Sequence, residues 1–206
     1  MGVFCIAWSA LFVRWAGVSG PASAFYRVLV ATLVLVPVRL WRGEKSPPHR
    51  GAILLGCLAG VFFALDVALF NSAVLRTSAA NSTLLGNNAP VLVGLGSWLV
   101  FRKRPRRVYW LGLLLALTGS GTIAVGDALR HVGQLHAGAS GGLSGGFGTG
   151  DAMAVAASVF FAAYLLTIER VRSSMDTLTL TTIAVTASTV TLFLLCLLLG
   201  SSLTGY

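Results

Sequence analysis

The 206-residue sequence is 56% hydrophobic and only 10% charged, and it carries a formal net charge of +9. A soluble domain could not bury this much apolar surface, so the composition predicts an all-α integral membrane protein. The basic residues lie in short gaps between apolar blocks and do not interleave with aromatic residues, which argues against a nucleic-acid partner. The cysteines, Cys5, Cys57 and Cys196, have no paired spacing and no neighbouring histidine, so we expect neither a metal site nor a cofactor.

Long apolar blocks divide the chain into about seven candidate transmembrane helices. Most are long enough to cross roughly 30 Å of hydrocarbon at about 1.5 Å per residue. The first is short and begins at Met1, from which we expect that the true N-terminus is missing. The segments are approximately 1–16, 22–40, 52–72, 79–101, 108–126, 152–168 and 178–199.

The connections between these segments differ in charge. Those after the second, fourth and sixth segments hold most of the basic residues, namely Arg39, Arg42, Lys45, Arg50, Arg102 to Arg107, Arg170 and Arg172. The alternate connections carry only Arg76 and Arg130, and the later one contains the glycine-rich stretch 133–150. The positive-inside rule therefore predicts a cytoplasmic N-terminus, and a flexible extracytoplasmic loop follows the fifth segment.

A weak internal repeat relates the first segment to the sixth. Four residues of the first, Ala7, Ser9, Phe12 and Trp15, align at one constant offset with Ala156, Ser158, Phe161 and Tyr164. Five spans per copy would start the second copy on the opposite side of the membrane. This is the arrangement of inverted-topology repeats in secondary transporters.

Several motifs resemble the EamA-type transporters of the drug/metabolite transporter superfamily. They are Ser9 to Arg14 with Phe25-Tyr26-Arg27, the run Asn71 to Ala80, Asn88-Ala89-Pro90, and Gly150-Asp151 followed by an aromatic helix ending in Glu169-Arg170. The resemblance implies ten spans in two inverted five-helix repeats. Residues 1–126 would form the first repeat, 127–150 a glycine-rich loop, and 151–206 the start of a truncated second repeat.

The resemblance also implies a function, the movement of a small metabolite or drug-like solute across the cytoplasmic membrane by alternating access. The expected partners are this solute and the lipid bilayer, and assembly as a homodimer is left open. We expect no enzyme: the lysines needed by a retinal protein and the histidines needed by an intramembrane serine protease all lie in loops. A helical bundle with a receptor-like or structural role, which transports nothing, is the alternative.

Ionisable residues inside the bilayer are the first candidates for a site, because each costs about 2.5–3.5 kcal/mol on insertion scales. Arg14, Arg27 and Asp66 lie at comparable depth in the outer half of the membrane. They predict either a site for an anionic or zwitterionic substrate, with Asp66 as a protonatable coupling group, or a structural ion pair. We expect Asp66 to pair with Arg27 or Arg14.

Two further patterns occur on helix faces. Trp8, Phe12 and Trp15 follow one stripe of the first segment, which either lines a substrate path or forms an aromatic ridge facing lipid or another helix. By the internal repeat, Ser9 and Tyr164 join the candidate path. Gly56 and Gly60, with Ala52 and Ala64, form a small-residue pattern that predicts close helix packing.

The fourth segment holds the predicted substrate pocket, near the middle of the membrane. Asn87, Asn88 and Pro90 coincide there, and Pro90 is expected to bend the helix and free the carbonyl of Gly86. Polar side chains at this depth should face the interior of the bundle. The alternative is that the asparagines only link helices through hydrogen bonds.

The charge pattern predicts which loops are accessible from outside the cell. A cysteine at Ser140 should react with a membrane-impermeant maleimide on intact cells, and a cysteine at Ser46 should react only after the membrane is opened. The reverse labelling pattern would contradict this topology.

Overall fold

The computed structural model describes residues 20–43, 49–76, 85–86, 88–101, 107–135 and 148–198. All regular secondary structure in these ranges is helical, which confirms the predicted all-α class. The six assigned helices are α2 (Gly20–Arg42), α3 (Arg50–Arg76), α5 (Ala89–Phe101), α6 (Arg107–Leu135), α7 (Thr149–Val171) and α8 (Thr177–Leu198). Four of them, α2, α3, α7 and α8, are long and apolar enough to span a membrane.

The predicted segments 22–40, 52–72, 152–168 and 178–199 each correspond to one of these four helices. The first segment, 1–16, lies outside the described residues, as does most of the N-terminal half of the fourth. The count of seven spans, the inverted repeat and the domain boundaries therefore stay predictions. What the described helices establish is a multi-pass membrane protein.

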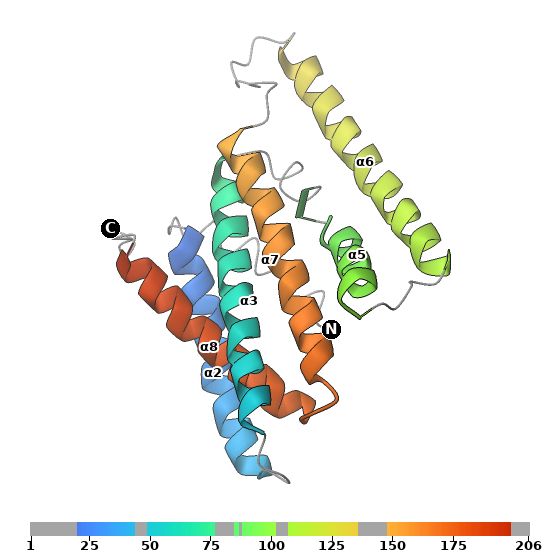
Figure 1. Ribbon diagram of the computed structural model, residues 1–206. Coiled ribbons are helices and arrows are strands. Elements are labelled where there is room, and N and C mark those ends of the chain that lie inside the picture. The colour runs from blue at the N-terminus through green and yellow to red at the C-terminus, as the bar shows by residue number, and fades with distance from the viewer. Residues whose placement is uncertain are drawn as a thin grey trace.

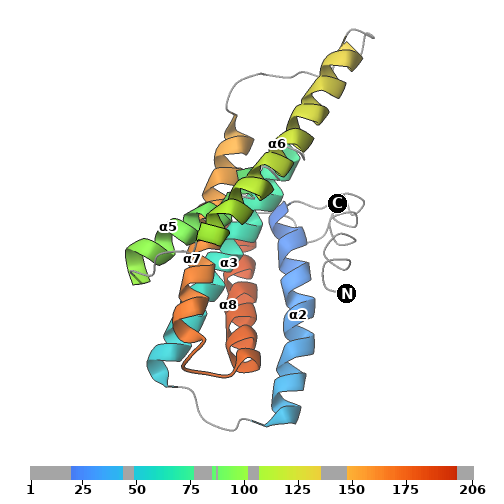
Figure 2. The ribbon, with the colours of Figure 1, turned by 90° about the vertical axis from the view of Figure 1, so that its right-hand side faces the viewer.

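The spanning helices form a bundle around α3. Figure 1 shows α2, α3, α7 and α8 side by side, with α5 next to α7 and α6 outermost on that side. The view from the right, in Figure 2, shows α6 running obliquely to the helices of the bundle, with its C-terminal end extending beyond them. Helix α3 contacts α2, α7 and α8, so it is the centre of the packing.

Close packing of α3 on α8 depends on Gly60. A Cβ atom at Gly60 would collide with the backbone oxygen of Ala184 and would lie 2.7 Å from the Cβ of Ala187. The buried Ser188 hydroxyl lies 2.7 Å from the carbonyl oxygens of both Gly60 and Ala184, so it can donate its hydrogen bond across the interface. The predicted packing role of the Gly56 and Gly60 pattern is thus confirmed, and a Cβ at Gly56 would approach Ile183 to 3.1 Å.

Helix α2 closes the other side of α8. Phe25 and Val28 are buried against Ala64, Ala68 and Leu192 in one apolar cluster. Farther along α2, the hydroxyls of Thr32 and Thr189 lie 2.7 Å apart and share a hydrogen bond, which links the two helices within the bundle.

Helix α6 extends beyond its predicted end. Residues 127–150 are predicted to form a loop, but the structure keeps residues 127–135 helical. The segment 127–135 contains alanine, leucine and valine, and the dense glycine run begins only after it, so helix propensity carries α6 onward to Leu135. The predicted loop is correspondingly shorter.

Helix α7 begins at Thr149, beside the Gly150-Asp151 motif. The Asp151 carboxylate accepts a hydrogen bond from the backbone N–H of Gly148 at 3.1 Å. It also lies in the first turn of α7, where a negative charge complements the helix dipole. These interactions fix the helix start although glycine has no side chain with which to cap it.

Large apolar side chains on the outside of the helices are strongly exposed: Trp41 is 90%, Leu99 82% and Leu115 77% accessible. Water would disfavour such a surface, whereas hydrocarbon does not. The exposed faces are therefore suited to contact with lipid.

Replacing glycine by alanine should have different effects on stability at Gly60 and at Gly119. Gly60→Ala should destabilise the bundle by about 1–3 kcal/mol, because a backbone atom of α8 occupies the space for its methyl group. Gly119→Ala should not destabilise it, since no heavy atom lies within 4 Å of a Cβ there and alanine favours the helix. Unfolding of the purified variants in dodecyl sulfate provides the measurement, and equal stability of the two would contradict the packing described.

Candidate functional site

A helix break occurs where the sequence predicted a polar pocket in the fourth segment. Leu85 and Gly86 are helical, Asn88 lies in a turn, and α5 begins at Ala89. The carbonyl oxygen of Asn88 accepts hydrogen bonds from Val91 N at 3.0 Å and Leu92 N at 3.3 Å. Asn88 therefore occupies the N-cap position of α5, which asparagine favours.

The break differs from the bend expected in one continuous helix. Pro90 lies in the first turn of α5, where its missing N–H would have no helical partner in any case. The backbone N–H of Asn88 donates to the carbonyl of Leu85 at 3.3 Å, so a turn connects the helical residues Leu85 and Gly86 to α5. Asn87, the third predicted residue of this pocket, lies outside the described residues.

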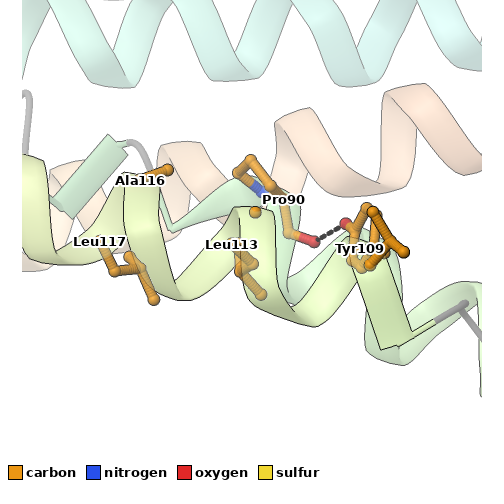
Figure 3. A pocket seen from close by; sticks show the side chains of 7 residues that line it. Pro90, Tyr109, Leu113, Ala116 and Leu117 are labelled. Atoms are coloured by element: carbon orange, nitrogen blue, oxygen red, sulfur yellow. Dashed lines mark hydrogen bonds between the residues drawn. The ribbon is translucent and has the colours of Figure 1, made fainter.

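A cavity of about 490 Å³ adjoins the break, between α5 and α6 (Figure 3). Its polar contact is a hydrogen bond from the Tyr109 hydroxyl to the carbonyl oxygen of Pro90, at 2.5 Å. The cavity has the size of a small-molecule site. Its lining is otherwise largely apolar: Pro90, Val108, Tyr109, Gly112, Leu113, Ala116 and Leu117.

Two glycines allow α5 to fit between its neighbours. A Cβ at Gly94 would lie 2.8 Å from the Tyr109 ring of α6, and a Cβ at Gly96 would lie 2.5 Å from a methyl group of Leu166 in α7. Residues two apart point to nearly opposite sides of a helix. Each glycine therefore accommodates a different neighbouring helix.

Asp66 lies on the face of α3 that packs against α7. At 100° per residue it falls between Phe62 and Phe63 around the helix. The ring centroid of Phe62 is 6.3 Å from that of Phe160, and that of Phe63 is 5.2 Å from that of Tyr164. The structure thus brings Asp66 and Tyr164, two predicted site residues, to one partly buried helix interface.

The helix break lies close to the same interface. A Cβ at Gly86 would approach the ring of Phe70 to 3.0 Å, and Phe70 follows Asp66 by one turn of α3. The break at Asn88 is therefore about one helical turn from the level of Asp66. Gly86 thus lies against the ring of Phe70, one turn of α3 from Asp66, and α5 itself packs against α7.

The expected pair of Asp66 with Arg27 is not formed: within the described part of the chain, neither side chain makes a salt bridge. Arg27 has the expected depth, since its neighbours Phe25 and Val28 pack at the level of Ala64 and Ala68. Its own side chain, however, lies on the exposed face of α2. Asp66 points to α7, on a different face of α3 from the one that α2 contacts.

The other predicted residues are placed only in part. Trp8, Ser9, Phe12 and the expected ion-pair partner Arg14 lie outside the described residues. The repeat partners of Ser9 and Phe12 lie on α7: Ser158 is buried, and the Phe161 ring stacks with Tyr164 at 6.0 Å.

Sequence reasoning missed Tyr109. The signal available was the aromatic pair Tyr109-Trp110 immediately after the basic run, which is typical of a membrane interface. Such a pair predicts an interfacial position but not the hydrogen bond to Pro90, because the partner is 19 residues away on another helix.

The bond from Tyr109 predicts a modest role in holding α6 against α5. Tyr109→Phe keeps the ring beside Gly94 but removes the hydroxyl, and should reduce stability by about 0.5–1.5 kcal/mol. Hydrogen exchange of α6 should rise in this variant, while exchange of α3 should not change. Equal exchange in α6 before and after the substitution would show that the bond contributes nothing.

Comparisons with known proteins agree with this architecture. The uncharacterized transporter YwfM of Bacillus subtilis (strain 168) is 32% identical over 95 residues, which cover 46% of this chain and 32% of that protein. Solute carrier family 35 member G1 of Mus musculus is 26% identical over 105 residues, covering 50% of this chain and 28% of that protein. The matched region spans less than a third of the length of these curated relatives. No solved structure matches the chain.

The family comparison covers more of the sequence. Residues 1–125, more than half of the chain, match the EamA-like transporter family. The match includes the helix break at Asn88 and the acidic residue on α3. The chain therefore belongs to the EamA-like transporter family.

Proposed function

We propose that this chain transports a small metabolite or drug-like solute across the cytoplasmic membrane by alternating access. The observation that carries this function is the turn at Asn88 between the helical residues Leu85-Gly86 and α5, with Gly86 against Phe70, one turn of α3 from Asp66. Discontinuous helices near the membrane midplane are typical of transporter binding sites, because they expose backbone groups to a substrate. A purely structural bundle has no need for such an interruption.

Three predicted residues have distinct roles in this proposal. Asp66 binds the charged part of the solute or a coupling ion, because a carboxylate this far inside the bundle requires a counter-charge or a proton. Tyr164 provides a ring and a hydroxyl on the facing helix. Asn88 binds a polar group of the solute through its amide, close to the N-terminus of α5.

The cavity beside Pro90 suits the apolar part of the same solute. Its walls are mainly aliphatic and aromatic, and its hydroxyl and carbonyl groups are hydrogen-bonded to each other. Movement of α6 away from α5 would break the hydrogen bond from Tyr109 to Pro90. The pair α5 and α6 is therefore suited to opening and closing one side of the path.

Orientation in the membrane follows from charge. The positive-inside rule supports a cytoplasmic N-terminus, with the basic ends of α2 and α7, which carry Arg39, Arg42 and Arg170, on the cytoplasmic side as well.

Asn88 permits a test that separates substrate binding from helix capping. Asn88→Ala should lower the transport rate by about two- to tenfold, the equivalent of one hydrogen bond. Asn88→Ser keeps an oxygen suited to the N-cap, so it should retain normal abundance but still lose transport. Uptake of a panel of labelled metabolites into vesicles containing the chain supplies the rates, and immunoblotting supplies the abundance.

Two results would count against the proposal. Full transport in the serine variant would show that position 88 only caps α5. The absence of transport of any solute in the panel, with the protein folded in the vesicles, would favour the receptor-like or structural bundle.

A further inference from the structure

A second cavity, of about 380 Å³, lies in a groove between α2 and α8, with α3 at its base. It is lined by Val36, Arg39, Leu40, Cys57, Thr182, Ile183, Thr186, Ala187 and Val190. None of the residues proposed to bind the transported solute contributes to it. The groove therefore requires its own explanation.

The groove has a polar end and an apolar end. Contacts of Thr32 with Thr189 and of Phe25 with Phe193 show that α2 and α8 run antiparallel. This register places Arg39 level with Thr182, near the end of α2 and the start of α8. From Thr182 the groove continues along α8 to Val190, a distance of about 12 Å toward the middle of the bilayer.

Positive charge is concentrated at the polar end. Arg39 and Arg42 lie in the last turn of α2, and Arg50 begins α3. No acidic residue lines the groove among the described residues. The nearest acidic position along α8, Asp176, accepts a hydrogen bond from the backbone N–H of Leu178 at 3.2 Å.

The threonines of the groove are already satisfied within α8. Thr182 donates to the carbonyl of Leu178 and Thr186 to that of Thr182, both over less than 3 Å. Arg39 is the charged residue among the described residues that line the groove, and its guanidinium carries five N–H donors. A guanidinium at the level of the lipid phosphates, above an apolar channel, matches an amphipathic anion.

We propose that this groove binds one anionic phospholipid, with its phosphate at Arg39 and an acyl chain along Val36, Ile183 and Val190. A soluble anion would leave the apolar walls of the groove without a partner. A zwitterionic lipid would bring the positively charged part of its headgroup next to the arginines. By the charge-derived topology, this end of the bundle faces the cytoplasmic leaflet, where anionic lipids attract basic residues.

Arg42 provides a matched control, since it lies one turn beyond Arg39 on the same helix but does not line the groove. General attraction to an anionic leaflet contributes about 1 kcal/mol per basic residue, so it predicts the same roughly fivefold loss for either arginine. A specific site predicts a larger loss for Arg39→Gln, about ten- to a hundredfold, because a charge-assisted hydrogen bond is also removed.

Native mass spectrometry of the chain in mild detergent, titrated with dioleoyl phosphatidylglycerol or dioleoyl phosphatidylcholine, measures this difference. The expected result is one phosphatidylglycerol bound in preference to phosphatidylcholine, a preference lost in Arg39→Gln and largely kept in Arg42→Gln. Thr186→Phe, a change at an exposed position, should fill the groove and reduce binding without removing charge.

Several results would overturn the assignment. Equal losses for the two arginine variants would show that lipid only accumulates around a basic surface. Equal binding of the two lipids by the unmodified chain would remove the role of charge. Full competition by millimolar inorganic phosphate would identify a soluble-anion site, and undiminished binding by Thr186→Phe would show that the acyl chain lies elsewhere.

Discussion

The close approach of α3 to α8 at Gly60 is the contact on which the remaining arrangement depends. Lipid tails are as apolar as the side chains that face them, so helices in a bilayer associate through close packing and hydrogen bonds. Gly60 lets the backbones meet, and Ser188 adds a hydrogen bond at the same point. With α8 fixed on one face of α3, the face that carries Phe62, Phe63 and Asp66 is left for α7. The small residues on one face of α3 thus determine that Asp66, on another face, lies toward α7.

A similar division of roles explains how an interrupted helix is tolerated inside the membrane. Irregular backbone is stable at this depth only where protein or a polar cavity covers it. The Asn88 carbonyl accepts from the amides of Val91 and Leu92 in the first turn of α5, and Pro90 has no amide N–H to satisfy. Gly94 and Gly96 then allow α6 and α7 to cover the two sides of α5. The residues of the fourth segment therefore act together: some satisfy the backbone groups at the turn, and the glycines let neighbouring helices cover it.

The sequence predicted helix positions and depths well, but it did not predict rotations about the helix axes. Apolar length located four spanning helices, and the glycine pattern of α3 identified its packing face. Depth also placed Arg27 and Asp66 at one level. Their side chains nevertheless point in different directions, because the orientation of α2 is set by Phe25 and Val28 packing on α3 and α8. The hydrogen-bond partner of Tyr109 could not be predicted from the sequence either, because the proximity of α5 and α6 at Pro90 is a property of the fold.

Depth and side-chain length together explain why the charged residues of this bundle have different environments. Arg39 lies one turn from the end of α2, and its long side chain can reach the phosphates while its stem lies along apolar surface. Asp66 lies about 15 Å from the nearer end of α3, and its short side chain cannot reach either interface. Its charge must be balanced inside the bundle, and the rings of Phe62 and Phe63 flank its position on α3. In the function proposed above, an ion, a proton or a solute completes the site, and each of these has to enter and leave. An interior carboxylate beside an interrupted helix is therefore better suited to transport than to the permanent joining of helices.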